Sequence, residues 1–357
     1  MGRASGSPSY VAFRFVTCPL VGRTGAGEGL VSQVETSGKS SSVRLAVYRG
    51  MFVTRRWQAG GIADRQLPLG DEIFLDHVAH FVRDREAARA ALARAGFAPT
   101  PLSIQANPDP AGGAPTPTGT GNVTAMFARG YVEVLFRTAD TALGRELDAA
   151  LARYPGLHLA AFAVADAGAA HRRLGEAGFA MQPLVEMQRP VETAEGPGLA
   201  AFTIARLVPG QMAEGRTQLL THRTEATVWQ PRWLAHPNGA RALDALTIAV
   251  ADVDEAAARF SRFTDRPPRA CAGGETIALD RGAVELVTPD MFAARFPEIA
   301  IPRLPFMGAC AVAVASLATA EAALRRGGIA ARRDGDRLVA PFPDALGIGA
   351  WVFAEGA

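Results

Sequence analysis

Two side chains, Glu133 and His77, form a candidate pair for metal or polar-ligand chemistry. Glu133 lies inside the apolar run from Tyr131 to Phe136. Because an unpaired carboxylate is costly to bury, a Glu in such a strand is expected to have a cation or a hydrogen-bond partner. His77 lies in a second apolar run, where alone it would equally well be a partly exposed sheet residue. Divalent metals bind imidazole and carboxylate groups, so the pair together favours a metal or polar-ligand site.

The run around His77 belongs to a unit that occurs more than once. Residues 75–84 and 157–166 are short apolar segments ending in Asp, each followed by an Ala-rich helical segment and then Gly-Phe. The Asp suits a helix N-cap, and the Gly suits the left-handed residue that ends a helix. A third copy begins at residue 243 and a weaker fourth copy at residue 307. The chain is therefore predicted to be built from repeated modules.

Each module continues with about three less regular, β-rich segments. One such sheet cannot cover both of its faces, so the modules are expected to pair into cupped mixed sheets with helices outside. The prediction is an α+β fold of tandem βαβββ modules. Residues 1–70 are predicted to be a flexible or mis-annotated N-terminal segment, 71–223 the first module pair with the candidate site, 224–240 a linker and 241–357 a second, degenerate pair.

Three short segments, taken in order, resemble the vicinal-oxygen-chelate superfamily and, within it, the glyoxalase-like domain proteins. They are residues 75–78 (LDHV) on the first strand, 119–122 (GTGN) before the second and 130–134 (GYVEV) on the last. The resemblance extends over about residues 73–353 and is strongest in the first two modules. It implies a glyoxalase/dioxygenase-like fold in which paired modules form a cupped sheet. It also implies a divalent metal in the cup that chelates adjacent oxygen atoms of a substrate.

The resemblance assigns roles by position. His77 takes the first-strand metal position and Glu133 the last-strand one, with Glu133 also the candidate catalytic base. In module two the matching residues are Leu159 and Gln218. His222 shares a strand face with Gln218 by period-two alternation, so it is a third candidate ligand; the alternative is a capping or surface residue at a strand end. Two imidazoles and one carboxylate suit a divalent metal such as Fe(II), Mn(II), Zn(II) or Ni(II).

Other side chains are candidate substrate contacts rather than metal ligands. These are Asn122, Phe127, Tyr131, Gln218 and Trp229. Trp229 lies in the 224–240 segment, which is either a plain connector or a cover over the pocket. His80, an odd number of residues from His77 on the same strand, is expected to face the helices instead.

The second module pair has lost the ligand pattern. Ala245 and Ala309 stand where His77 stands in module one, and Glu285 keeps the last-strand carboxylate without a visible partner. A structural or dimerising role is therefore expected for this pair, which leaves a homodimer open.

Composition narrows the functional class. The formal charge is only +2 and Arg is spread among acidic residues, which argues against nucleic acid as a partner. The three cysteines lack C-x-x-C spacing, which favours a reducing compartment, and a cytoplasmic location is expected. No apolar run reaches the roughly 18–20 residues that span a bilayer, so no membrane partner is expected.

Two functions from different classes follow. The first is a metalloenzyme of the lyase, isomerase or dioxygenase type that acts on a small oxygen-rich organic substrate by metal chelation. The second is a metal-free small-molecule binding or resistance protein of the same fold, which the residues Leu159, Ala245 and Ala309 favour. Metal binding by His77 and Glu133 distinguishes the two.

Overall fold

The computed structural model describes residues 65–109 and 111–356. Most of the expected N-terminal segment, residues 1–64, lies outside these ranges. Residues 65–70 are joined to the folded chain, because Arg65 forms an ion pair with Glu72 at 2.8 Å and its carbonyl accepts a hydrogen bond from Arg281. Within the described ranges, no helix is both long and apolar enough to cross a membrane.

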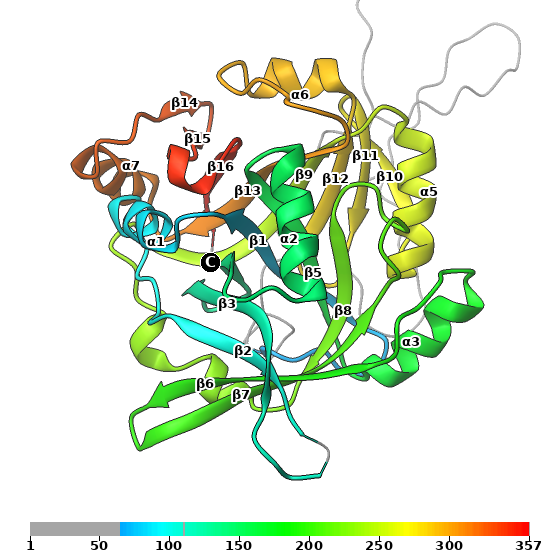
Figure 1. Ribbon diagram of the computed structural model, residues 1–357. Helices are drawn as coiled ribbons and strands as arrows, with labels where there is room; N and C mark the ends of the chain where they lie inside the picture. Colours follow the sequence, from blue (N-terminus) through cyan, green and yellow to red (C-terminus); the bar gives the residue numbers. More distant parts are fainter. Residues whose placement is uncertain (1–64, 110, 357) are drawn as a thin grey trace, which may run out of the picture. The chain divides into compact units, whose positions relative to one another are not determined.

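Modules one and two form a closed barrel of eight strands (Figure 1). Module one consists of β1 (Ile73–Val82), α1 (Arg85–Arg94), β2 (Ser103–Asn107), β3 (Thr116–Met126) and β4 (Tyr131–Arg137). Helix α2 (Ala142–Arg153) leads to module two, which consists of β5 (Gly156–Val164), α3 (Ala167–Glu176), β6 (Val185–Thr193), β7 (Gly196–Arg206) and β8 (Arg216–His222). The order is β1-β4-β3-β2-β6-β7-β8-β5. The predicted pairing of βαβββ modules is thus confirmed. The first pair forms a closed barrel rather than an open cupped sheet, because β1 pairs with β5 and β2 pairs with β6.

The repeated Asp and Gly have the local roles that the sequence predicts. The Asp84 carboxylate accepts hydrogen bonds from the backbone of Glu86 and Ala87 at the start of α1. Asp166 caps α3 in the same way. Gly96 follows α1 with φ +81°, a conformation that glycine adopts without steric cost. Both helices therefore start and stop where the strand–helix pattern requires.

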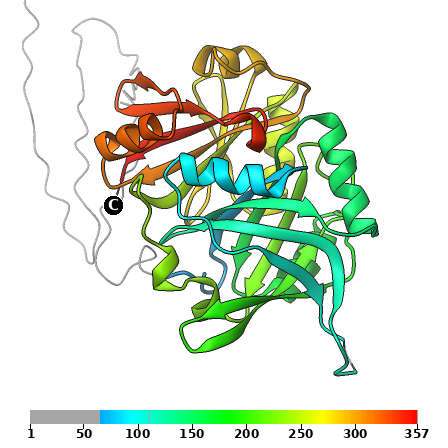
Figure 2. The same cartoon turned by 60° about the vertical axis from the view of Figure 1, so that its left-hand side comes forward.

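Modules three and four form a second sheet of eight strands, in the order β10-β11-β12-β9-β13-β16-β15-β14 (Figure 2). The connection from the barrel holds α4 (Glu225–Val228) and the short 3-10 helix Pro231–Trp233. Module three consists of β9 (Ala240–Ala249), α5 (Val253–Thr264), β10 (Pro268–Cys271), β11 (Gly274–Ala278) and β12 (Ala283–Val287). After α6 (Pro289–Arg295), module four consists of β13 (Phe306–Val314), α7 (Leu317–Arg326), β14 (Arg332–Asp334), β15 (Arg337–Pro341), the 3-10 helix Asp344–Leu346 and β16 (Ala350–Glu355).

The face of the second sheet that corresponds to the barrel interior is filled by apolar side chains. Phe292 of α6 packs there together with Phe296 and Phe306, and their rings contact one another. Glu285, which lacked a visible partner in the sequence, binds Arg295 at 3.0 Å and accepts a hydrogen bond from Thr247. The acid that module three retains is therefore paired with an Arg of the same module pair.

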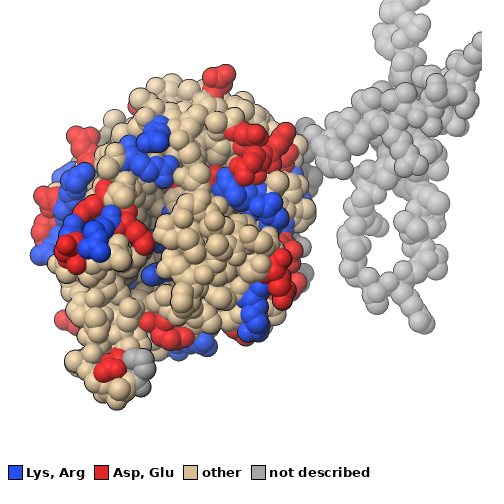
Figure 3. Space-filling model, turned by 45° about the vertical axis from the view of Figure 1, so that its right-hand side comes forward, with Lys and Arg blue, Asp and Glu red and all other residues tan. Residues whose placement is uncertain are grey.

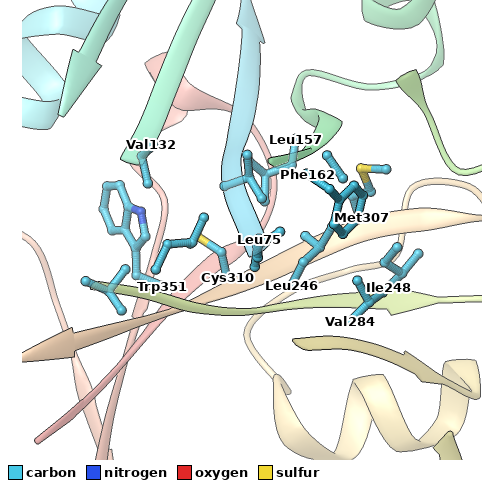
Figure 4. Packing of buried hydrophobic residues seen from close by; sticks show 14 of the residues in the cluster. Leu75, Val132, Leu157, Phe162, Leu246, Ile248, Val284, Met307, Cys310 and Trp351 are labelled. Atoms are coloured by element: carbon cyan, nitrogen blue, oxygen red, sulfur yellow. The ribbon is translucent and has the colours of Figure 1, made fainter. Parts of the chain in front are cut away.

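The main hydrophobic core lies between the outer face of the barrel and the helix-bearing face of the second sheet. Figure 4 shows Leu75 and Leu157 of the barrel close to Leu246 of β9 and Met307 of β13. Backbone bridges join the two sheets as well, including Phe74 with Arg281. The barrel and the second sheet therefore share one core rather than packing as separate domains with separate cores.

Two buried histidines lie at this junction. His80 faces away from the barrel interior, as its odd spacing from His77 predicts, but it packs on module four rather than on the helices. Its Nδ1 bonds to the carbonyl of Leu346 at 2.9 Å and its ring contacts Trp351. His158 of β5 bonds through Nε2 to the Tyr154 carbonyl at 2.6 Å. Burial lowers the pKa of each to about 4, because the charged form of the ring loses hydration there.

These two histidines should make folding sensitive to mild acid. The unfolded chain binds protons near pH 6.5 and the folded chain only near pH 4, so stability is complete above pH 6.5 and falls as the pH drops toward 4. Each group should weaken folding by about 2 kcal/mol between pH 7 and pH 5. In His80→Gln, this loss should shrink by about the contribution of one group, as measured by urea unfolding at both pH values. Identical pH dependence in wild type and variant would contradict the assignment.

Candidate functional site

A cavity in the barrel interior is lined by at least one side chain from every strand of the barrel. Module one contributes a wall of imidazole, carboxylate and amide groups, here called the first wall: His77, Gln105, Asn122 and Glu133. Module two contributes a second wall that carries three guanidinium groups and an amide: Arg189, Arg206, Arg216 and Gln218. Between them lie Tyr131 and apolar side chains: Leu135, Leu159, Met187, Phe202, Ile204 and Leu220. The two halves of the cavity are therefore chemically unlike.

A β-bulge on β1 places two neighbouring side chains in contact. In the pairing with β5, Leu75 is opposite Phe162 and His77 is opposite Ala161, so Asp76 is the extra residue. Adjacent residues of a regular strand point to opposite faces, and a bulge re-aims one of them. The Asp76 carboxylate consequently binds Nδ1 of His77 at 2.7 Å. The sequence pattern alone gave no sign of this contact.

Asp76 also contacts β8, the last strand of module two. Its second oxygen lies 2.8 Å from Nε2 of His222, so one buried carboxylate joins two imidazoles. Burial acts to raise the pKa of Asp76, but the charges and hydrogen bonds of His222 and His77 outweigh it and hold that pKa well below its usual range. Asp76 is therefore an ionised acceptor at neutral pH, and it keeps the proton of His77 on Nδ1.

The other ring nitrogen of His77 is directed at Glu133. The distance between His77 Nε2 and Glu133 Oε2 is 3.6 Å. The second carboxylate oxygen of Glu133 accepts hydrogen bonds from Asn122 at 2.5 Å and from Gln105 at 3.4 Å. Both atoms of the His77–Glu133 pair are acceptors when Nδ1 carries the proton, so a proton or a cation between them is needed to make the contact favourable.

This pair fits a divalent cation. Metal–nitrogen and metal–oxygen bonds of about 2.0–2.2 Å allow two ligands of one ion to lie about 3 to 4 Å apart. The separation of 3.6 Å falls in that range. A metal-binding His commonly donates its other N–H to a carboxylate, as His77 does to Asp76. The two atoms therefore have the spacing of two metal ligands, and His77 has the carboxylate hydrogen bond that commonly orients a metal-binding His.

The third ligand that the sequence suggested, His222, is placed differently. Its Nε2 is bonded to Asp76, and its Nδ1 has no hydrogen-bond partner among the described residues. In the part of the chain that the structure describes, no three His, Cys, Asp or Glu side chains form a group able to hold a metal. Gln218 occupies the module-two equivalent of Glu133, because Ala161 is opposite Gln218 as Ala79 is opposite Glu133. Its Oε1 accepts a hydrogen bond from Arg206 at 3.2 Å.

The remaining predicted contacts divide into three groups. Asn122, Tyr131 and Gln218 line the cavity, and the Tyr131 ring stacks on His77 with centroids 4.4 Å apart. Burial and the nearby Asp76 and Glu133 carboxylates raise the pKa of Tyr131, so it stays a neutral phenol. Trp229 is buried beside the cavity, in contact with His222 and Tyr131. Phe127 does not line the cavity; it packs against Phe97 in the main core, on the opposite side of the strand from Met126.

The second wall was missed by sequence reasoning. Arg189 lies on β6 two residues after Met187, and Arg206 ends the apolar strand β7. An Arg that alternates with apolar residues along a strand is the signal that would have pointed to an inward cation. Which way these strands face depends on their register around the closed barrel, and sequence periodicity does not give that register.

Comparison with known proteins agrees with this architecture. Residues 75–264, more than half of the 357-residue chain, match the family described as "Glyoxalase-like domain". The chain belongs to the glyoxalase-like domain family. The resemblance to the vicinal-oxygen-chelate superfamily is thereby confirmed. No curated protein matches this glyoxalase-like domain protein in sequence.

The solved structures that match have low sequence identity, and among those named here the first shares the fold. A hypothetical protein from Staphylococcus aureus superposes with a TM-score of 0.56 at 8% identity, covering 80% of this chain and 100% of its own. A triple mutant of 4-hydroxymandelate synthase from Streptomyces coelicolor gives 0.49 at 14% identity, over 80% and 94% of the two chains. A xylose isomerase-like TIM barrel/4-hydroxyphenylpyruvate dioxygenase fusion protein gives 0.47 at 12% identity, over 81% and 50%.

The bridging role of Asp76 leads to a stability prediction for this glyoxalase-like protein. Replacing Asp76 by Ala leaves two buried imidazole N–H groups without an acceptor, so the free energy of unfolding should fall by about 2–5 kcal/mol. Asp244 is the equivalent residue of module three and is exposed. Asp244→Ala should therefore cost less than about 1 kcal/mol. Urea unfolding at pH 7 measures both; equal losses in the two variants would contradict the bridge.

Proposed function

We propose that this protein is a metal-dependent enzyme of the lyase, isomerase or dioxygenase type, with its site in the barrel of modules one and two. The proposal is carried by one observation. His77 Nε2 and Glu133 Oε2 face each other at 3.6 Å in the cavity. The other ring nitrogen of His77 is bonded to Asp76, and the other carboxylate oxygen of Glu133 accepts a hydrogen bond from Asn122. The substrate class is a small organic molecule with neighbouring oxygen atoms.

His77 and Glu133 would hold the metal. A bound divalent metal supplies Lewis-acid stabilisation of negative charge on the oxygens of a chelated substrate. The residues around it have separate tasks. Asp76 keeps the His77 proton on Nδ1 and leaves the Nε2 lone pair free. Asn122 and Gln105 hold one oxygen of Glu133 and leave Oε2 as the atom able to bind a cation or accept a substrate proton.

The packing around the cavity limits the access of bulk water. Helix α2 covers one end of the barrel, since its Leu147 and Leu151 are buried in the same cluster as Leu135 of β4. Near the start of β4, Tyr131 packs against Trp229. A low-water surrounding strengthens the electrostatic interactions between the first wall and a bound oxygen-rich ligand.

A metal-free binding protein is the second candidate, and one observation favours it. His222 Nε2 is bonded to Asp76, and Gln218 Oε1 is bonded to Arg206. Module two as placed therefore adds no third ligand to His77 and Glu133. In this alternative the contact between His77 and Glu133 is made through a proton, and the cavity binds its ligand by polar contacts alone.

Metal titration separates the two candidates. Isothermal titration of the metal-stripped protein with Mn²⁺ and Zn²⁺ should show one site. His77→Ala and Glu133→Gln should each weaken binding at least 100-fold, and Asp76→Asn about 10- to 100-fold through the lost support of His77. His171→Ala is the control, because His171 lies on α3, outside the cavity lining, and bonds to the Gln182 carbonyl. Wild-type protein that binds neither metal, or variants with wild-type affinity, would overturn the enzyme proposal in favour of the metal-free one.

A further inference from the structure

The second wall of the cavity carries positive charge that the protein itself does not neutralise. Arg189 of β6 is only 6% exposed. Across residues 65–109 and 111–356, no carboxylate oxygen forms an ion pair with its guanidinium, and no hydrogen bond from it is formed either. Its electrostatic partners are Tyr131 and, across the cavity, Glu133. A buried guanidinium keeps its charge at neutral pH, so Arg189 presents an uncompensated cation to the cavity.

Arg206, which is half-buried, adds a second positive charge to this wall. It donates from Nε to the neutral amide of Gln218 at 3.2 Å, and within the described chain it has no ion pair. Burial, together with the neighbouring charge of Arg216, lowers the pKa of Arg206 to about 10, which leaves it protonated at pH 7. Arg216 differs, because it is paired with Glu146 of α2 at 3.1 Å. Two of the three arginines thus form no ion pair with the described protein. Apart from Glu146, which is paired with Arg216, the carboxylate that attracts both is Glu133 across the cavity, so one negative charge faces two positive ones.

The charge arrangement in the cavity differs from that on one face of the surface. On the face of the molecule drawn in Figure 3, basic and acidic side chains are interspersed. In the cavity they are separated, with Glu133 on the first wall and the unpaired arginines on the second. Burying a charge without a partner is strongly unfavourable, so a protein that keeps two such cations in one cavity is expected to neutralise them with a ligand.

We propose that the ligand is an organic carboxylate, and that Arg189 and Arg206 bind its carboxylate group while its neighbouring oxygen atoms face His77 and Glu133. A guanidinium matches a carboxylate with two parallel hydrogen bonds, which fixes the orientation of the ligand as well as its charge. The apolar side chains between the walls, among them Leu159, Phe202 and Leu220, suit a hydrocarbon portion. This assignment rests on the proposed function in one respect, namely that the oxygen atoms of the same ligand face His77 and Glu133. Binding of the carboxylate by the two arginines does not depend on it.

Acids and their neutral esters test the proposal directly. The probes are phenylpyruvate, 2-oxobutanoate and 3,4-dihydroxybenzoate, each with its methyl ester, titrated calorimetrically in EDTA and again with added Zn²⁺. At least one acid should bind tenfold or more tightly than its ester, in EDTA as well as with metal. Arg189→Met and Arg206→Met should each weaken binding of that acid at least tenfold and leave ester binding unchanged. Arg145→Met, an exposed change on α2, should alter neither.

Thermal unfolding without ligand controls for folding. Because each substitution replaces an unpaired buried cation by an apolar group of similar length, the Tm of Arg189→Met and Arg206→Met should equal or exceed that of wild type. A lower Tm together with lost binding would make these arginines structural and overturn the proposal. The proposal would also be overturned if no acid bound more tightly than its ester, or if this preference remained in both Arg variants. If His77→Ala and Glu133→Gln lose metal but keep the acid preference in EDTA, the enzyme proposal fails while this one stands.

Discussion

One buried carboxylate, that of Asp76, connects the parts of the barrel that matter for chemistry. It lies on the first strand of module one and binds His77 on the same strand and His222 on the last strand of module two. These two strands are not neighbours, because β5 lies between them in the order of the barrel. The orientation of His77, and with it the direction in which Nε2 points, therefore depends on an ionised group that a bulge directs inward. A regular strand at this position would separate His77 from its acceptor.

The four modules show different outcomes for one structural position. The last-strand acid faces a cavity in module one as Glu133, is an amide in module two as Gln218, and is paired with Arg295 in module three as Glu285. In module four the equivalent residue is the apolar Val352, which follows from the pairing of β13 with β16. The same backbone thus supports a polar site in module one, whereas in module three Glu285 is bonded to Arg295 and Thr247 and an apolar cluster with Phe292 and Phe306 packs on the sheet.

The sequence predicted those features that depend on local chemistry and on the repeat. The helix caps at Asp84 and Asp166, the inward direction of His77 and Glu133, and the equivalence of Gln218 with Glu133 all follow from spacing along single modules. Features set by the register between distant strands were not predictable in this way. The pairing that closes the barrel and the bulge at Asp76 depend on how strands of different modules align, and the convergence of Arg189 and Arg206 depends on the register of β6 with β7. A one-residue shift in that alignment would reverse which side chains enter the cavity.

The contact of His80 with module four has a consequence for how the second half of the chain is maintained. His80 is three residues from His77 on β1, and its ring is fixed by the Leu346 carbonyl and by Phe342 and Trp351. The second sheet thus helps to fix the position of β1, the strand that carries His77. A random mutagenesis screen for loss of function would accordingly return hits in residues 342–351, far along the chain from any residue that meets the ligand. The chemistry of this half can therefore differ from that of the barrel, while its packing against β1 supports the position of His77.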